Sequence, residues 1–249
     1  MAARECCRVT DSLCRDEFRQ KNCQFPLWRI GKFPIIGHRQ SMNLPAEGKA
    51  CILILAAYAM GCFTSGYYLV KWRTDQDIRT AGSGSTGATN VSRALGRSGF
   101  AVTFLLDCLK GGIAVGLAVV CQLATLGLLL TMLAVVAGHI WPLQLRFRGG
   151  KGVATALGAL LAFNYVIVVI LAGLFLIIFA IQRNFVISGL AAFAGLPLAL
   201  YGLRFPLSSV CGILTLSSLL IVAHRNNLPE EWRNLLARRK LKIPDHPIR

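Results

Sequence analysis

Long apolar runs, separated by short polar breaks, follow one another along most of this 249-residue chain. A helix that crosses a membrane needs about 20 predominantly apolar residues, and 55% of the chain is hydrophobic. A soluble domain of this length rarely has such a composition. The chain is therefore predicted to be an all-α, polytopic integral membrane protein.

The polar breaks divide the apolar sequence into about seven predicted transmembrane helices. The expected spans are Ala50–Val70, two within 99–139 that are split near Cys121 and Gln122, a short one and a full one within 152–181 that are split at Asn164, Val186–Leu203 and Leu207–Ala223. Polar or proline-containing turns at Arg183-Asn184 and Arg204-Phe205-Pro206 mark the last two breaks.

Basic residues gather in alternate breaks, which sets the expected orientation. They lie in 71–98, in 144–151, at Arg183 and after His224. Because Lys and Arg are enriched in cytoplasmic segments, the N-terminus is predicted to be outside and the C-terminus inside. The net charge of +16 has the same explanation. The basic residues form no continuous face, so no nucleic-acid partner is expected.

Residues 1–41 differ from the rest of the chain. They hold four cysteines and eight basic residues, but no apolar run long enough for a secretory signal. We interpret them as a disordered extension or as upstream sequence from a misassigned start, with Met42 as the alternative start. The transmembrane domain is then 42–224, and 225–249 form a basic cytoplasmic tail. The nine cysteines lack metal-ligand spacing, and neither a metal site nor a disulfide is assigned.

A stretch of glycines and small polar residues, Thr80–Asn90, lies between two apolar segments. Glycine allows the backbone to turn several N–H groups toward one small anion. A flexible linker has a similar composition, and for this stretch alone a linker is the better interpretation. The other polar segments on the same predicted membrane face favour an anion cradle.

Two further polar segments are expected on the cytoplasmic side. One continues from His139 and Trp141-Pro142 to Gly149-Gly150-Lys151-Gly152, where a helix is expected to begin. The other starts the tail with His224 and Asn227. Glycines and a lysine at a helix N-terminus suit a phosphate group. No Lys-Ser/Thr pair follows the glycines at Walker A spacing, so an NTPase is not expected.

With these three segments in this order, the chain resembles the bacterial acyl-phosphate-dependent glycerol-3-phosphate acyltransferases from about Ala50 to Lys240. The resemblance implies an enzyme of phospholipid biosynthesis in the bacterial cytoplasmic (inner) membrane, with its active site facing the cytoplasm. It would transfer a fatty acyl group from acyl phosphate to the sn-1 hydroxyl of glycerol 3-phosphate, giving 1-acylglycerol 3-phosphate (lysophosphatidate) and phosphate. No cofactor is implied.

The resemblance also assigns roles to residues. The acyl-phosphate cradle would be Gly82, Ser83, Gly84, Gly87, Thr89 and Asn90; the glycerol 3-phosphate phosphate would meet Arg93 and Lys151, with Gly149 and Gly150 beside them; and the glycerol would meet His224 and Asn227. Ser188 would represent the family's serine in the preceding span. The catalytic set is Ser83, Arg93, Lys151, His224 and Asn227. The family usually has asparagine at the position of Ser85. The loss of that side-chain amide is expected to loosen the cradle.

Other interpretations compete at several points. Asp107 and Lys110, three residues apart in a span, are expected to be a structural pair rather than catalytic groups. His139 either caps a helix beside Trp141 or has a functional role. For the whole chain, the alternative function is a transporter or flippase for an anionic lipid precursor. Against that alternative, the sequence has no convincing internal repeat, and the candidate groups gather at one face.

Overall fold

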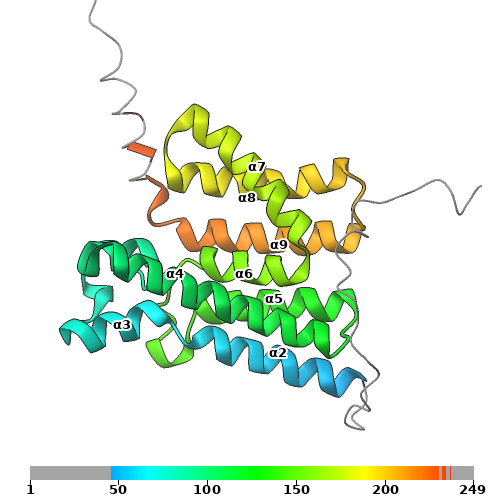
Figure 1. Cartoon of the computed structure of the whole chain (residues 1–249), viewed down its shortest axis with the longest axis horizontal. Helices are drawn as coiled ribbons and strands as arrows, with labels where there is room; N and C mark the ends of the chain where they lie inside the picture. Colours follow the sequence, from blue (N-terminus) through cyan, green and yellow to red (C-terminus); the bar gives the residue numbers. More distant parts are fainter. Residues whose placement is uncertain (1–45, 230–231, 234–235, 237–249) are drawn as a thin grey trace, which may run out of the picture.

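The computed structural model describes residues 46–229, 232–233 and 236, and all regular structure in them is helical (Figure 1). The helices are α2 (Ala46–Cys62), α3 (Ser65–Thr74), η2 (Ile78–Thr80), α4 (Ala88–Val120), α5 (Thr125–Ile140), η3 (Leu143–Leu145), α6 (Val153–Phe163), α7 (Tyr165–Gln182), α8 (Phe185–Gly202) and α9 (Leu207–His224). The expected extension 1–41 and most of the tail 225–249 lie outside the described residues.

Most of the predicted breaks are where the sequence places them. Helices end and begin around Cys121-Gln122, at Asn164, at Arg183-Asn184 and at Arg204–Pro206. Six helical segments of the described chain are long and apolar enough to cross a membrane, and the 11-residue α6 is a shorter apolar helix. The all-α, multi-pass membrane fold is therefore confirmed, while the count of seven spans and the orientation of the termini stay predictions.

The first expected span lies within one candidate membrane span, Glu47–Thr74, but it contains a break that the sequence does not predict. Helix α2 ends at Cys62 and α3 begins at Ser65. A break releases backbone carbonyls that water cannot satisfy inside a membrane. Here Lys110 Nζ donates to the carbonyls of Gly61 and Phe63, and Gln144 Nε2 donates to that of Cys62. The break is thus sealed by side chains from α4 and the η3 turn.

Helix α4 begins earlier than the apolar sequence suggests. The expectation was a polar segment up to Ser98, but the helix starts at Ala88 with Gly87 as its N-cap. Val91 is buried while Arg93 and Arg97 are exposed, so this first part is amphipathic. Gly96, with φ 70° and ψ −161°, interrupts it before the apolar part continues. Thr89, Asn90 and Arg93 therefore lie on a helix and not in a loop.

Close helix pairs bring the polar segments together. Glycines let α4 approach α6 and α2 approach α5, since an added Cβ at Gly158 would overlap Cys108, and one at Gly138 would overlap Tyr58. In Figure 1, α4, α5 and α6 form the middle of the bundle, with α2 on one side and α7 to α9 on the other. A buried apolar core, including Met132, Leu160, Leu196 and Leu216, joins α5, α6, α8 and α9.

Candidate active site

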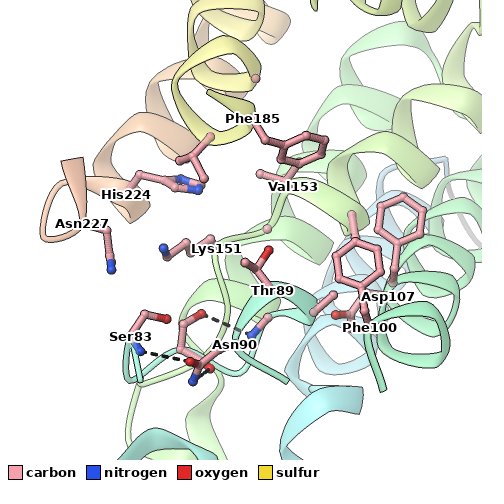
Figure 2. A pocket seen from close by; sticks show the side chains of 18 of the residues that line it. Ser83, Thr89, Asn90, Phe100, Asp107, Lys151, Val153, Phe185, His224 and Asn227 are labelled. Atoms are coloured by element: carbon pink, nitrogen blue, oxygen red, sulfur yellow. Dashed lines mark hydrogen bonds between the residues drawn. The ribbon is translucent and has the colours of Figure 1, made fainter. Parts of the chain in front are cut away.

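A cavity of about 170 Å³ lies where several of these helices begin or end (Figure 2). Its lining comes from the loop before α4, from α4, from the end of α5, from the turn before α6, from the first turns of α6 and α8, and from the end of α9 and the residues after it. The polar lining includes Ser83, Thr89, Arg93, Lys151, His224 and Asn227. The three polar segments are distant from one another in sequence, yet they contribute residues to the same cavity.

The glycine-rich loop is a fixed structure organised by Asn90. The Asn90 side chain is buried, and its Nδ2 donates to the carbonyls of Ile78 (3.2 Å), Ala81 (3.0 Å) and Ser85 (2.9 Å). Its Oδ1 accepts from the backbone N–H of Ser83 at 3.0 Å. These bonds engage both ends of the amide. Asn90 thus shapes the cradle, and the linker interpretation does not fit this loop.

Arg79 joins the base of this loop to the rest of the molecule. Arg79 bonds the Asp77 carboxylate at 2.6 Å through Nη2, and its Nη1 donates to the Leu145 carbonyl at 2.8 Å. The hydrogen bond from Arg79 lowers the pKa of the Asp77 carboxyl below its usual value. Arg79 is thereby committed to the η2 turn, away from the cavity.

The Gly-Gly-Lys-Gly turn packs directly against the end of α5. The N–H groups of Gly150 and Gly149 donate to the carbonyls of His139 (3.0 Å) and Ile140 (3.1 Å). Added Cβ atoms would overlap the His139 ring at Gly150 and the His139 carbonyl at Gly149. The turn also accepts a bond from the Thr86 N–H to the Gly149 carbonyl at 3.2 Å. The cradle and the turn that carries Lys151 are therefore joined.

His224 presents one ring nitrogen to the cavity. Its Nδ1 lies 2.8 Å from the Leu220 carbonyl. A carbonyl oxygen only accepts, so Nδ1 carries the proton, and Nε2 of the neutral ring is an acceptor. Asn227 follows one turn later, with its N–H bonded to the His224 carbonyl at 2.9 Å. Figure 2 shows Lys151 reaching into the space between these two residues and Ser83.

The electrostatic character of the cavity comes from backbone as well as side chains. Helices α4, α6 and α8 all begin at it, through Ala88 and Thr89, Val153 and Ala154, and Phe185 and Val186. The first N–H groups of a helix have no partner within the helix and carry a partial positive charge. Together with Arg93 and Lys151, three such helix starts give this cavity the positive character that suits anions.

The rest of the lining is apolar and aromatic. Phe100 and Phe104 stack on one face of α4, with ring centroids 5.9 Å apart. Across the cavity lie Leu157, Phe185 and Leu190. One cavity thus combines an anion-binding end with an apolar wall among helices long enough to cross a membrane.

Comparisons with known proteins agree with this chemistry. A family model described as glycerol-3-phosphate acyltransferase matches residues 51–234. The chain belongs to this family. It is 44% identical over 188 residues to glycerol-3-phosphate acyltransferase 1 of Desulfitobacterium hafniense, covering 76% of this chain and 93% of that relative. It is 38% identical over 195 residues to glycerol-3-phosphate acyltransferase of Parasynechococcus marenigrum, covering 78% and 92%.

Solved structures of an acyltransferase give the same result. The glycerol 3-phosphate form of PlsY (YgiH), an integral membrane glycerol 3-phosphate acyltransferase, matches with a TM-score of 0.70 and 34% identity. The match covers 76% of this chain and 94% of that one. The lysophosphatidic acid form of the same protein matches with a TM-score of 0.67. Fold, family and the resemblance in the sequence therefore agree.

In this acyltransferase-family chain, the cavity gathers most of the residues that the sequence singles out. The following line it: Ser83, Gly87, Thr89, Asn90, Arg93, Lys151, His224 and Asn227. Gly82, Gly84, Gly149 and Gly150 shape the segments that border it without lining it. Ser188 is fully buried in α8 and does not line the cavity, although its neighbours Gly189 and Leu190 do. The contacts of all these sequence-predicted residues with substrates stay predictions.

Several lining residues were not predicted from the sequence. Phe100, Phe104 and Phe185 look like ordinary membrane-facing residues, and nothing in their spacing marks a cavity. Ser85 lines the cavity, and its Oγ accepts from the Gly87 N–H at 3.2 Å, so the cradle has a local tie at this position without the family's usual asparagine. Asp107 and His139 reach the same cavity from the bundle interior.

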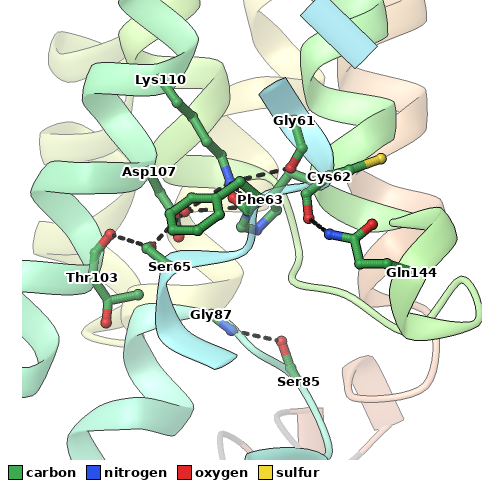
Figure 3. Close-up of polar contacts among 11 residues, drawn as sticks. Gly61, Cys62, Phe63, Ser65, Ser85, Gly87, Thr103, Asp107, Lys110 and Gln144 are labelled. Atoms are coloured by element: carbon green, nitrogen blue, oxygen red, sulfur yellow. Dashed lines mark hydrogen bonds and ion pairs between the residues drawn. The ribbon is translucent and has the colours of Figure 1, made fainter. Parts of the chain in front are cut away.

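The expected pair of Asp107 and Lys110 is present, with 2.9 Å between Nζ and Oδ1 (Figure 3). Ser65 Oγ donates to the same carboxylate oxygen at 2.8 Å. His139 joins them, because its Nδ1 lies 2.7 Å from Lys110 Nζ. An ammonium group only donates, so His139 is neutral and carries its proton on Nε2. The His139 side chain therefore takes part in the buried polar cluster, which the capping interpretation did not include.

Proposed function

We propose that this protein transfers a fatty acyl group from acyl phosphate to the sn-1 hydroxyl of glycerol 3-phosphate. The products are 1-acylglycerol 3-phosphate and inorganic phosphate. One observation carries the proposal: a single cavity places three helix N-termini, Arg93 and Lys151 next to an aromatic, apolar wall. Both substrates are anions, and one of them has a long apolar chain, so each part of the cavity has a use.

Two phosphate groups must meet in one site, and the fold offers two groups of donors. The first is the Asn90-ordered loop with Ser83, Thr89 and the start of α4, which suits the phosphoryl group of acyl phosphate. The second is Arg93 and Lys151, which suit the phosphate of glycerol 3-phosphate. Fixed donors that neutralise charge lower the barrier without a protein nucleophile, because acyl phosphate is already activated.

The attacking hydroxyl needs orientation, and His224 can supply it. Nε2 of His224 is the free acceptor of the ring, since Nδ1 donates to Leu220. We assign Nε2 to accept a hydrogen bond from the sn-1 hydroxyl, with Asn227 beside it. The hydroxyl oxygen then attacks the acyl carbon, the bond from that carbon to the phosphate oxygen breaks, and the hydroxyl proton passes to the departing phosphate. Phe100 and Phe104 provide apolar surface for the acyl chain.

The proposed location is the bacterial cytoplasmic (inner) membrane, with the cavity open to the cytoplasm. Basic residues near the cavity, including Arg93 and Lys151, support this orientation through the positive-inside rule. Water-soluble glycerol 3-phosphate would then enter from the cytoplasm, while the acyl chain stays among the apolar helices.

The test is a turnover assay with the purified full-length protein in detergent. We expect lysophosphatidate and phosphate to form in equal amounts from acyl phosphate and glycerol 3-phosphate. Acyl-CoA in place of acyl phosphate is expected to give no product. Lysophosphatidate formed from glycerol 3-phosphate with acyl-CoA as the only acyl donor would contradict the assigned donor. No turnover with either donor, in protein that still binds glycerol 3-phosphate, would favour a transporter.

A further inference from the structure

A buried ammonium group, that of Lys110 on α4, lies outside the anion-binding set yet contacts several parts of the site. Its Nζ bonds Asp107 Oδ1 at 2.9 Å, the Phe63 carbonyl at 2.7 Å, His139 Nδ1 at 2.7 Å and the Gly61 carbonyl at 3.3 Å (Figure 3). An ammonium has three N–H donors, and these four acceptors use them all. Lys110 has no donor left for a substrate.

On one side, Lys110 holds the break between α2 and α3. Both carbonyls that it binds there are released by the break, and Ser65, the first residue of α3, donates to Asp107 of the same pair. The next residue, Gly66, packs so closely on the cradle that an added Cβ would overlap the Thr86 carbonyl. The position of the break therefore supports the cradle.

On the other side, Lys110 holds the turn that carries Lys151. Its bond to Nδ1 fixes the orientation of the His139 ring, whose Nε2 edge lies against Gly150. The Gly150 N–H also donates to the His139 carbonyl at 3.0 Å. A rotation of the His139 ring or a shift of this end of α5 would therefore move the residue just before Lys151.

We propose that Lys110 is a positioning residue that sets the placement of the cradle relative to Lys151. It acts through two routes that meet at the Thr86 to Gly149 bond, 3.2 Å long. A charge inside a membrane protein is costly unless it is paired, and Asp107 supplies the pair. The inference rests on the proposed function, because Lys151 is taken there to bind glycerol 3-phosphate.

A double-mutant cycle between Lys110 and Lys151 tests this. We expect Lys110→Met to lower kcat/KM about 100-fold, as for a misplacement of about 1 Å, with a raised KM for glycerol 3-phosphate. In a Lys151→Ala background the same substitution is expected to cost less than about threefold, because coupled residues are non-additive. A full additional loss in that background, or unchanged kinetics in folded Lys110→Met, overturns the proposal.

A purely structural role gives a different pattern, and a matched control separates the two. Ser217→Ala removes another buried bond between helices, from Ser217 Oγ to the Phe193 carbonyl at 2.7 Å. It is expected to lower the melting temperature but leave KM for glycerol 3-phosphate unchanged. If Ser217→Ala raised the KM for glycerol 3-phosphate as much as Lys110→Met does, any loosening of the helix bundle would be enough to weaken substrate binding. That result would overturn the specific role of Lys110.

Two additions keep the test decisive. If Lys110→Met does not fold, Ser65→Ala replaces it in the same cycle; we expect about a tenfold loss that shrinks in the Lys151→Ala background, and an additive or absent effect overturns the proposal. Calorimetric binding of glycerol 3-phosphate is measured in all variants. If the wild-type protein binds glycerol 3-phosphate but forms no product, only the proposed reaction is overturned. If the losses of binding affinity from the Lys110 and Lys151 substitutions are additive, only the positioning role is overturned.

Discussion

The loop over residues 82–87 and the turn over residues 149–152 are both rich in glycine and both border the cavity, but they use glycine differently. In the loop, Gly82 has φ +59°, and an added Cβ would overlap Asn90 Oδ1. In the turn, Gly149 and Gly150 have no room for a Cβ because α5 lies against them. Gly82 is therefore needed for the backbone conformation of the loop, and Gly149 and Gly150 for the close packing of the turn. Gly152, with φ +82°, is a residue of the turn that resembles Gly82 in this respect.

At Gly87 a third situation exists. Its φ of −75° suits any residue, and the nearest atom to an added Cβ is Ser85 Oγ at 3.5 Å. The protein itself therefore gives no reason for glycine at this position, although it lines the cavity. Segments of similar composition can therefore need glycine for backbone conformation, for close packing or to leave space for a substrate. Substitutions of single glycines can distinguish these three reasons.

The largest effect is expected for Gly150→Ala. The new methyl group has to displace the buried His139 ring, and overpacking typically costs about 1–3 kcal/mol. We expect a strongly reduced melting temperature and loss of nearly all activity, measured by thermal unfolding in detergent and by the turnover assay. A stable and active variant would show that the turn does not depend on this packing.

Lys151→Ala is expected to separate charge from packing in the same turn. The ammonium is proposed to bind the glycerol 3-phosphate phosphate, and a hydrogen bond to a charged group is worth about 1.5–3 kcal/mol. KM for glycerol 3-phosphate should rise about 10- to 100-fold, with little change in melting temperature. Initial rates over a range of glycerol 3-phosphate concentrations check this, and an unchanged KM would contradict the assigned role.

Gly82→Ala is expected to damage the loop more than the fold. A positive φ costs a non-glycine residue about 1–2 kcal/mol, and the overlap with Asn90 Oδ1 disturbs the bond to the Ser83 N–H. We expect a modest fall in melting temperature and a KM for acyl phosphate raised about tenfold. Equal losses for both substrates would mean that the loop does not favour one of them.

Gly87→Ala is expected to leave stability within about 0.5 kcal/mol of the wild type. If the space next to Gly87 holds the phosphoryl group, the added methyl will still weaken binding of acyl phosphate. The comparison is between melting temperature and KM for acyl phosphate in one variant. A wild-type value for both would place the phosphoryl group elsewhere in the cavity.

The smallest effect concerns the base of the loop and appears only in acid. The pKa of Asp77 is lowered in the folded protein by the hydrogen bond from Arg79. This stabilisation is therefore present above the ordinary Asp pKa of about 3.9 and is lost as pH falls through the lower folded value. Because the pair is partly exposed, we expect less than about 1 kcal/mol.

Thermal unfolding between about pH 5 and pH 3 measures this contribution. Asp77→Asn should flatten part of the acid dependence that the wild type shows. Asp75→Asn is the comparison variant: Lys71 also lowers the pKa of the Asp75 carboxyl, but the Asp75 side chain is 93% exposed, so its substitution is expected to change the acid dependence less. The proposed tie at Asp77 fails if the two variants give the same pH profile.

Much of the fold was predictable because membrane helices end where polar residues interrupt apolar runs. Asn164 and Asn184 illustrate this, since each side chain accepts a backbone bond at the start of the next helix. The break at Phe63-Thr64 was not predictable, because the groups that seal it, Lys110 and Gln144, are far away in sequence. A lysine within a membrane span indicates that a buried acceptor group needs a hydrogen-bond donor, but it does not indicate which group that is.

The site was predictable to a similar degree. The polar segments that supply its charged groups stand out against apolar surroundings, and the cavity does gather Arg93, Lys151, His224 and Asn227. Their supporting contacts were not predictable, because the overlap between Gly150 and His139 depends on how α5 meets the following turn. The aromatic wall was also hidden, since Phe100 and Phe104 resemble any lipid-facing pair.

The three helix starts around the cavity also have a consequence for the acidity range over which it can work. Peptide N–H groups do not gain or lose protons between acid and alkaline conditions, whereas lysine and histidine do. Part of the attraction for phosphate is therefore built into the main chain and is independent of proton concentration. A change of pH that altered the charge of side chains around the cavity would therefore leave this backbone contribution as it is.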